Sequence, residues 1–554
     1  MSRIVKLRAS LEDGSRLCLV DAFAARLGEE GMADELGVAP SELRRDVSVW
    51  GSYMWGYADV GADIYTALGI VALAALGFTP LAFLFAGLVY AMVGLGYAEL
   101  ASAYPVAGGG QYYTLRGIGD LAGFIAGAAL LLDYTIDISL FMVVSFGYFN
   151  YFLPYVAFGH HVEYFTITLG PIHLAWLWLL ETLVGIMILI WLNVRGIRMS
   201  SAFNEILGVI AIIGQSIIVV AGFVLVWQPS LVAQQFTMNR PTLAQFAFGS
   251  SLAIISFVGL ESISQVAQET RRPATIIPRT SIGLILSVLI FAMAFAVLAM
   301  GMIPAQGFRG HEGDPVALIA GHVPVIGIVA APLTALIGGM IVFISANSGV
   351  VSASRLTYSM SQFQLLPRWF NAVNKKRGTP MRTIIVFSGV AIVQTLFAFF
   401  TPGKPGSNAA IDLLTNLYAF GATSGYLLVF TSLMVLRFRD PYTPRPYKMP
   451  FNIPIKFSGR KVEFPVLGVV GFLGVSTILF EVILTHDVGR IAGPGWIILA
   501  VILYVLHRRK QGLPRFGNIP RDWEATQKRV LREAEEFESL EEYEATLAAN
   551  RAQP

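Results

Sequence analysis

Charged residues are scarce in this sequence. Lysine, arginine, aspartate and glutamate together make up 14% of its 554 residues, whereas hydrophobic residues make up 55%. A soluble domain carries about 25% charged residues, so this chain has too little polar surface to fold in water. The scarcity excludes an ordinary soluble globular protein and predicts that most of the chain lies in a lipid bilayer.

Cysteine and catalytic motifs are also nearly absent. The chain has one cysteine, Cys18, which excludes an intrachain disulfide and a cysteine-built metal site. It contains no P-loop, HExxH motif, nucleophile elbow or cofactor fingerprint, so we expect neither enzyme activity nor a cofactor. The formal net charge of +3 is small, and we expect no nucleic-acid partner.

Apolar runs fill most of the chain instead. A transmembrane helix needs about 20 such residues, and twelve runs meet this length: roughly 52–77, 80–103, 120–152, 172–192, 203–227, 244–266, 281–303, 324–358, 382–401, 410–436, 464–485 and 489–507. We therefore predict an all-α membrane protein with twelve transmembrane helices in residues 51–507. Residues 1–50 and 508–554 form the predicted tails, and the second contains a helical run.

Basic residues are distributed unevenly among the predicted loops. With the N-terminus inside, the exterior loops hold only Arg240, Arg309 and Lys404. The interior loops hold many more: Arg116, Arg195, Arg198, Arg271, Arg272, Arg279, Lys375, Lys376, Arg377 and the run from Arg437 to Lys461. Because cytosolic loops carry the excess of lysine and arginine, we predict a multi-pass cell-membrane protein with both termini in the cytosol.

Two predicted spans contain glycine beside acidic residues. The first has Asp59, Gly61 and Asp63, and the sixth has Phe257–Glu261 (FVGLE) near its middle. Such a composition at membrane depth indicates a broken helix whose freed backbone groups face protein or a cavity. The first and sixth spans hold equivalent places in two five-helix halves, which predicts inverted repeats over about 52–227 and 244–436. The two spans in 464–507 fall outside these repeats.

Four segments resemble the amino acid–polyamine–organocation superfamily. Val60–Tyr65 (VGADIY) is similar to its first-span GAGIF element, and Ala98–Tyr113 is similar to its second-to-third-span loop. Phe257–Pro278 resembles the sixth-span FxGxE and its tail, and Asn347–Pro380 resembles the eighth span with the following loop. The resemblance implies a LeuT-type five-plus-five fold. It also implies a secondary transporter that imports an amino acid or related amine by alternating access, coupled to a cation.

The sequence departs from this pattern at Asp63, where the family has a glycine. In the family, that glycine-rich turn presents backbone N–H groups to the carboxylate of the substrate. A carboxylate side chain there repels another carboxylate and attracts an amine or a cation. The resemblance implies a substrate site made of residues at both breaks: Gly61, Ala62, Asp63, Ile64, Tyr65, Phe257, Gly259 and Glu261. Capping of a broken half-helix by Asp63 and stabilisation of the sixth-span break by Glu261 are the alternative roles.

A second resemblance involves potassium importers of the Kup and Kim types. Asp59 and Tyr65 match the acidic and tyrosine positions of their first span, although the separation is one residue shorter here. Asp133 and Tyr134 in LLLDYTIDIS match LLVDYILTVA in the third span of the Kim type. This resemblance implies, as an alternative function, proton-coupled potassium import with a monovalent cation held at Asp59, Asp63, Tyr65 and Tyr134.

The coupling cation is the remaining question. The fifth span has no lysine near Ala211, where proton-coupled relatives place one, so H+, Na+ or K+ must act elsewhere. Asp133 and Asp137 share one helical face, and two such carboxylates both stay ionised only with a cation between them. Further candidates for coupling or gating are Asp59 and Tyr134, and the oxygen-bearing side chains Ser345, Asn347 and Ser348. Interhelical hydrogen bonding is the alternative for these three residues and for Asp133 and Asp137. The chain is expected to be a monomer or a homodimer.

Overall fold

The protein was analysed as a computed structural model. It describes Arg45 and residues 47–152, 166–169, 172–324, 327–374, 377–402, 409–457 and 460–551. Most of the predicted tail of residues 1–50 lies outside this part of the chain.

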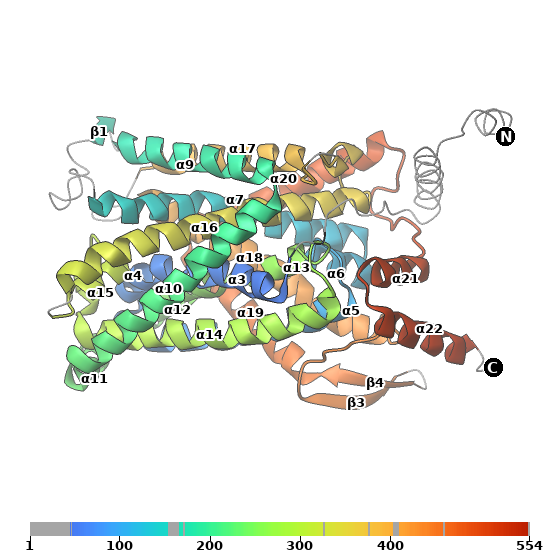
Figure 1. Ribbon diagram of the computed structural model, residues 1–554, viewed down its shortest axis with the longest axis horizontal. Coiled ribbons are helices and arrows are strands. Elements are labelled where there is room, and N and C mark those ends of the chain that lie inside the picture. Colours follow the sequence, from blue (N-terminus) through green and yellow to red (C-terminus); the bar gives the residue numbers. More distant parts are fainter. Residues whose placement is uncertain are drawn as a thin grey trace, which may run out of the picture.

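Long helices make up most of the described residues, and they run side by side along the longest axis of the molecule (Figure 1). The helices of the first half are α3 (Val49–Val60), α4 (Ile64–Ala75), α5 (Thr79–Ala103), α6 (Gly110–Gly117), α7 (Asp120–Phe149), α9 (Trp176–Arg195), α10 (Ile197–Leu225) and α11 (Pro229–Met238). Those of the second half are α12 (Leu243–Ala253), α13 (Ser262–Gln265), α14 (Pro273–Met302), α15 (Pro315–Gly321), α16 (Gly327–Gln362), α17 (Met381–Phe399) and α18 (Ala409–Arg439). The last helices are α19 (Val466–Thr485), α20 (Gly489–Lys510), α21 (Trp523–Glu533) and α22 (Phe537–Arg551).

Eleven helical segments of the described chain are long and apolar enough to cross a membrane. The first, Val49–Ala103, is 55 residues long and contains two of the predicted spans, 52–77 and 80–103. The short 3₁₀ turn Leu76–Phe78 separates these two. A multi-pass helical membrane protein is thereby confirmed, with eleven candidate segments in place of twelve separate ones.

Two small hairpins correct the prediction of an all-α chain. Strand β1 (Thr166–Leu169) pairs antiparallel with β2 (Ile172–Ala175), and β3 (Asn452–Phe457) pairs with β4 (Arg460–Pro465). Apolar and polar residues alternate in the second hairpin (NIPIKF, RKVEFP), which is the period of a strand with one exposed face. Strand β2 lies inside the predicted span 172–192, which becomes helical only at Trp176, and β4 extends to the start of the predicted span 464–485.

Both predicted helix breaks are present. Helix α3 ends at Val60 and α4 begins at Ile64, so Gly61–Asp63 form the first break. In the sixth span, α12 is followed by the 3₁₀ turn Ile254–Phe257, and helix resumes only at the four-residue α13. Helix α7 lies below α9 and α17 in Figure 1, packs against α16 and α18, and is buried along most of its length.

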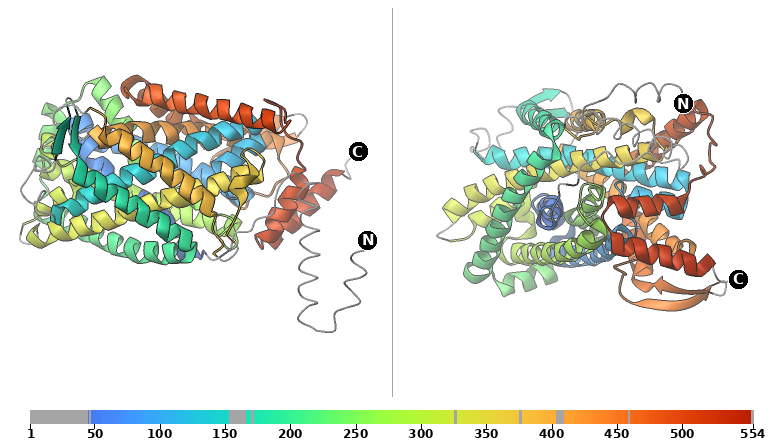
Figure 2. Two further views of the ribbon diagram at one scale, coloured as in Figure 1. Left: turned by 90° about the horizontal axis from the view of Figure 1, so that it is seen from above. Right: turned by 45° about the vertical axis from the view of Figure 1, so that its right-hand side comes forward.

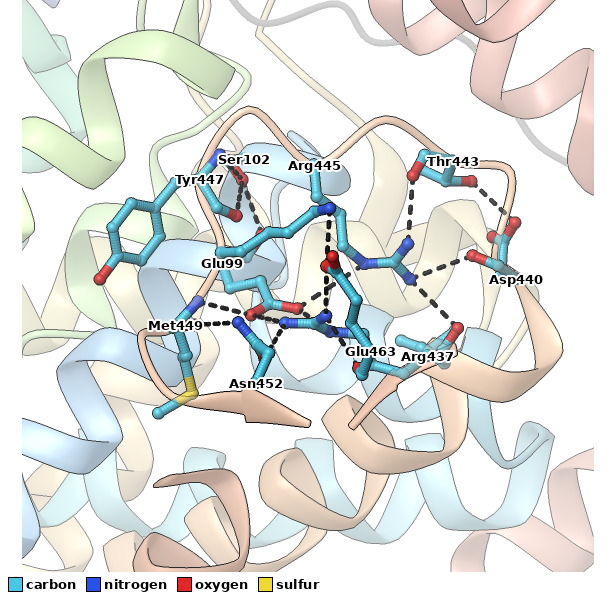
Figure 3. Close-up of polar contacts among 12 residues, drawn as sticks. Glu99, Ser102, Arg437, Asp440, Thr443, Arg445, Tyr447, Met449, Asn452 and Glu463 are labelled. Carbon is cyan, nitrogen blue, oxygen red and sulfur yellow. Dashed lines mark hydrogen bonds and ion pairs between the residues drawn. The ribbon is translucent and has the colours of Figure 1, made fainter. Parts of the chain in front are cut away.

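A buried ion pair joins α5 to α18 at one end of the molecule. The Arg437 guanidinium donates to both carboxylate oxygens of Glu99, over 2.6 and 2.7 Å. Their side chains are 4% and 0% exposed. The Met449 backbone N–H also donates to Glu99, over 2.9 Å, so the loop after α18 is held in the same cluster (Figure 3). This geometry is a bidentate, charge-assisted contact.

Glu99→Gln should destabilise the protein markedly, because it leaves the buried Arg437 guanidinium with only the half-exposed Glu463, 3.8 Å away, as a counter-charge. Loss of one partner of a buried pair costs about 3–5 kcal/mol. A large fall in the thermal unfolding temperature in detergent is the expected result. Glu463→Gln is the matched control, because Glu463 lies 3.8 Å from the same Arg437 guanidinium but its side chain is 52% exposed. An equal fall in both variants would contradict the prediction.

Candidate functional site

Asp59 brings the two helix breaks together. Its carboxylate accepts hydrogen bonds from the hydroxyls of Ser348, over 2.9 Å, and Ser345, over 3.3 Å, both on α16. A Cβ atom added to Gly259 in the sixth-span break would lie 2.8 Å from the Asp59 carboxylate carbon. The end of α3, the sixth-span break and the middle of α16 therefore meet at one buried point.

Gly259 is required at this point for two reasons. Its φ angle of +114° is one that side-chain-bearing residues rarely adopt. Its missing side chain also leaves the space that the Asp59 carboxylate occupies. The FVGLE pattern thus reflects both backbone conformation and close packing against the first break.

Asp63 is fully buried at the start of α4, and neither of its carboxylate oxygens has a hydrogen-bond partner among the described residues. The carboxyl groups of Asp59, Asp137, Glu261 and Asp133 lie near enough to interact electrostatically with it. Its neighbours Gly61, Ala62, Ile64 and Tyr65 are also buried. Tyr65 packs edge to face against Tyr148, and its carbonyl accepts a hydrogen bond from the Tyr148 hydroxyl over 2.9 Å. The first break therefore holds one carboxylate whose charge is not matched by any described basic group.

Glu261 and Asp133 form a carboxyl pair between the sixth-span break and α7. One Glu261 oxygen accepts from the Tyr426 hydroxyl over 2.6 Å and from the Gly259 N–H over 3.2 Å. Its other oxygen and both oxygens of Asp133 are buried without a hydrogen-bond partner among the described residues. This pair therefore holds three carboxyl oxygens that no described donor satisfies.

The other predicted residues contact side chains of neighbouring helices. The Tyr134 hydroxyl accepts from the Gln265 amide over 2.9 Å, and Asp137 lies within hydrogen-bonding reach of Tyr418. The Phe257 ring stacks on Tyr90 with 5.2 Å between ring centres.

Asn347 faces a different element from the two serines beside it. Its side-chain oxygen accepts from the Asn193 amide over 2.6 Å, so it contacts α9. Ser345 and Ser348, by contrast, face the first break. Of the three oxygen-bearing candidates on α16, only these two contact Asp59.

Gln215 on α10 was missed by the sequence analysis. Its amide nitrogen donates to the Gly61 carbonyl over 3.1 Å, and its amide oxygen accepts from the Tyr57 hydroxyl over 2.5 Å. It thereby satisfies a backbone carbonyl that the first break leaves free. The sequence feature that could have indicated Gln215 is its position as a single amide side chain in an apolar span, one helical turn after Ala211.

No lysine, arginine or histidine of the described residues forms an ion pair with the five central carboxylates Asp59, Asp63, Asp133, Asp137 and Glu261. Within the same part of the chain, no group of three or more His, Cys, Asp or Glu side chains is arranged to hold a metal ion. The centre is therefore acidic and suited to a ligand that brings positive charge.

Comparison with known proteins identifies the family. The family model described as amino acid permease matches residues 49–506 of this chain. The chain belongs to the amino acid permease family. This permease is accordingly a membrane transporter and not an enzyme, and the resemblance to the amino acid–polyamine–organocation superfamily is confirmed.

Several curated relatives cover most of this permease. The branched-chain amino acid permease BcaP of Bacillus subtilis is 27% identical over 504 residues, which cover 88% of this chain and 96% of the relative. The methylthioribose transporter of the same organism is 27% identical over 82% of this chain and 91% of its own length. Cationic amino acid transporter 1 of Arabidopsis thaliana is 24% identical over 78% and 69%.

These similarities decide between the two resemblances found in the sequence. The family and the relatives named above are amino acid transporters or, in one case, a methylthioribose transporter. None of them is a potassium importer, so the alternative function of potassium import is not supported. The acidic residues of the first and third spans belong to an amino acid permease.

Gly259→Ala should lower the unfolding temperature and abolish transport, because alanine at this φ is strained and its methyl group collides with Asp59. Backbone strain of this kind costs about 1–3 kcal/mol before the collision is counted. Gly389→Ala is the matched control: Gly389 lies in α17, and no atom lies within 4 Å of an added Cβ. That variant should be neutral or slightly stabilising. Thermal unfolding and proteoliposome uptake are measured for both variants. Equal unfolding temperatures and equal uptake would contradict the close packing of Gly259 against Asp59.

Proposed function

We propose that this permease imports an amino acid or related amine with a net positive charge, by alternating access around the two helix breaks. The observation that carries the proposal is the buried Asp63 carboxylate, whose two oxygens have no described partner. A buried, unpaired carboxylate costs several kcal/mol. A substrate ammonium or guanidinium group at this point supplies the missing charge and hydrogen bonds.

The substrate class rests on the excess of acidic groups over basic ones. An amino acid with an uncharged side chain brings one positive and one negative group, so it leaves the charge of the centre unchanged. A cationic amino acid or a diamine brings a net positive charge and lowers the repulsion among the five carboxylates. One relative is named for branched-chain amino acids and another for cationic amino acids. The acidic centre favours a cationic substrate.

The transport route rests on the two breaks. They occur in the first and sixth spans and meet at Asp59 and Gly259. This arrangement supports inverted repeats over about 52–227 and 244–436, with a site near the bilayer midplane. The uneven distribution of basic residues supports cytosolic termini, so the end of the molecule that holds α21 and α22 is proposed to face the cytosol.

The coupling cation is proposed to be a proton carried by Asp133 or Glu261, because both oxygens of Asp133 and one of Glu261 are buried without a described hydrogen-bond partner. Their side chains come from α7 and from the sixth-span break, so a change in protonation acts directly on the break. Loss of the proton leaves two adjacent carboxylates that repel each other. This repulsion favours rearrangement of the sixth-span break, which links proton movement to opening of the site.

Asp63→Asn should raise the KM for L-lysine uptake into proteoliposomes by about tenfold or more. The lost hydrogen bond to a charged group is worth about 1.5–3 kcal/mol, and 1.36 kcal/mol corresponds to a factor of ten. Asp487→Asn is the control, because the Asp487 side chain is 71% exposed. Preferred uptake of L-leucine with no effect of Asp63→Asn would overturn the proposed substrate class.

Asp133→Asn should abolish the accumulation of L-lysine in vesicles but leave the exchange of L-lysine intact. The variant keeps exchange of internal unlabelled for external labelled L-lysine, because exchange needs no net proton movement. It loses uptake against a concentration gradient when vesicles are given an inward pH gradient. The measurement compares both assays in the same vesicle preparation. Accumulation that persists in the variant, or that needs only a sodium gradient in the unaltered protein, would refute the proton pair.

A further inference from the structure

The segment after α20 folds back over one end of the helices. Figures 1 and 2 show α21 and α22 beyond the end of the helical body where α7 begins. Residues 508–551 make polar contacts with the ends of several helices there. These contacts form three anchors, each on a different part of the molecule.

The first anchor is Asp120 in the first turn of α7. Its carboxylate pairs with Arg508 and, over 2.5 Å, with Arg521, and all three side chains are at most 1% exposed. Arg521 also donates to the Phe363 carbonyl just after α16, over 2.7 Å. The segment therefore joins the end of α16 to the start of α7 through fully buried contacts.

The second anchor lies on α5 and α6. The Gln527 amide donates to the Ala103 carbonyl over 2.8 Å. Trp523 lies 5.4 Å from the Arg116 guanidinium, which also pairs with Asp440 over 2.6 Å. Burial alone raises the pKa of the Asp440 carboxyl, but Arg116 outweighs it and holds that pKa below its usual value. Helix α21 thus covers an ion pair that is fully charged at neutral pH.

The third anchor is Glu536 between α21 and α22. Its carboxylate accepts from the Thr275 N–H and hydroxyl, both over 3.3 Å, in the first turn of α14. Its side chain is 2% exposed and lies 4.0 Å from Arg272. Helix α14 follows closely after the sixth-span break, and the Val47 N–H donates to the Glu269 carbonyl in the stretch between them. This anchor therefore holds the start of α14, whose preceding residues are bonded to the segment that leads into α3.

We infer that residues 508–551 form a strap that keeps this end of the permease closed, and that release of Glu536 from α14 opens the central site towards it. The anchors lie on helices from both proposed repeats, and alternating access requires such helix ends to separate. The three anchors differ in strength. Asp120 is held by short, buried, charge-assisted contacts, whereas the contacts of Glu536 are 3.3 to 4.0 Å long, so Glu536 is released first. The inference rests on the proposed alternating access and not on the identity of the substrate.

Cutting the strap tests this inference without a transport assay. A stop after Asp522 removes α21 and α22 but leaves Arg521 on Asp120, and Glu536→Ala removes only the contact with α14. Hydrogen–deuterium exchange of the full membrane-embedded protein is followed in residues 59–66 and 257–265. Both changes should raise deuterium uptake in these segments several-fold, whereas Glu538→Ala should not, because its side chain is 92% exposed. Unchanged uptake in both variants would overturn the strap.

Locking the strap should have the opposite effect. Thr275→Cys and Glu536→Cys are combined in a Cys18→Ser background and joined by a bifunctional maleimide reagent. The cross-link should lower deuterium uptake at both breaks below that of the untreated protein and slow L-lysine exchange in proteoliposomes. Deuterium uptake that rises or stays equal after cross-linking would contradict the inference. A change in deuterium uptake without any L-lysine transport would instead reject only the proposed substrate.

Discussion

The unmatched negative charge at the centre of the molecule is the constraint on which the surrounding structure depends. Asp59, Asp63, Asp133, Asp137 and Glu261 are all at most 3% exposed. An ionisable group at membrane depth costs a few kcal/mol even on the most lenient scale. Hydroxyl donors on α16 and α18 meet part of this cost at Asp59 and Glu261. The first and sixth spans are both broken beside these carboxylates, at Gly61–Asp63 and around Gly259.

Buried acidic groups elsewhere in the same permease have arginine partners. Glu99, Glu269 and Asp120 are as deeply buried as the central carboxylates, but each is paired with an arginine. Figure 3 shows one of these pairs, in which Arg437 faces Glu99 from α18. The fold therefore supplies guanidinium partners where an acid serves to hold elements together. At the centre it supplies none among the described residues, which is the strongest physical reason to assign that charge to a substrate and a proton.

Local features of the sequence anticipated the positions of the breaks well. Gly61 and Gly259 stand beside acidic residues within apolar runs, and a glycine there has few explanations other than an irregular backbone. The sequence did not predict which neighbouring helix each side chain would contact. Ser345, Asn347 and Ser348 lie within four positions of one another on α16, yet Asn347 contacts Asn193 on α9 whereas the serines contact Asp59. A helical period predicts which residues share a face but not which neighbour that face meets.

The sequence by itself determined that the chain crosses a membrane many times and where its helices break. These properties depend on composition and on spacing over a few residues. Only the tertiary structure decided how each acid is satisfied. Tyr426 is 165 residues from Glu261, and Arg508 is 388 residues from Asp120. Contacts at such separations arise from the packing of whole helices, so one carboxylate is bonded by a tyrosine hydroxyl and another is paired with an arginine.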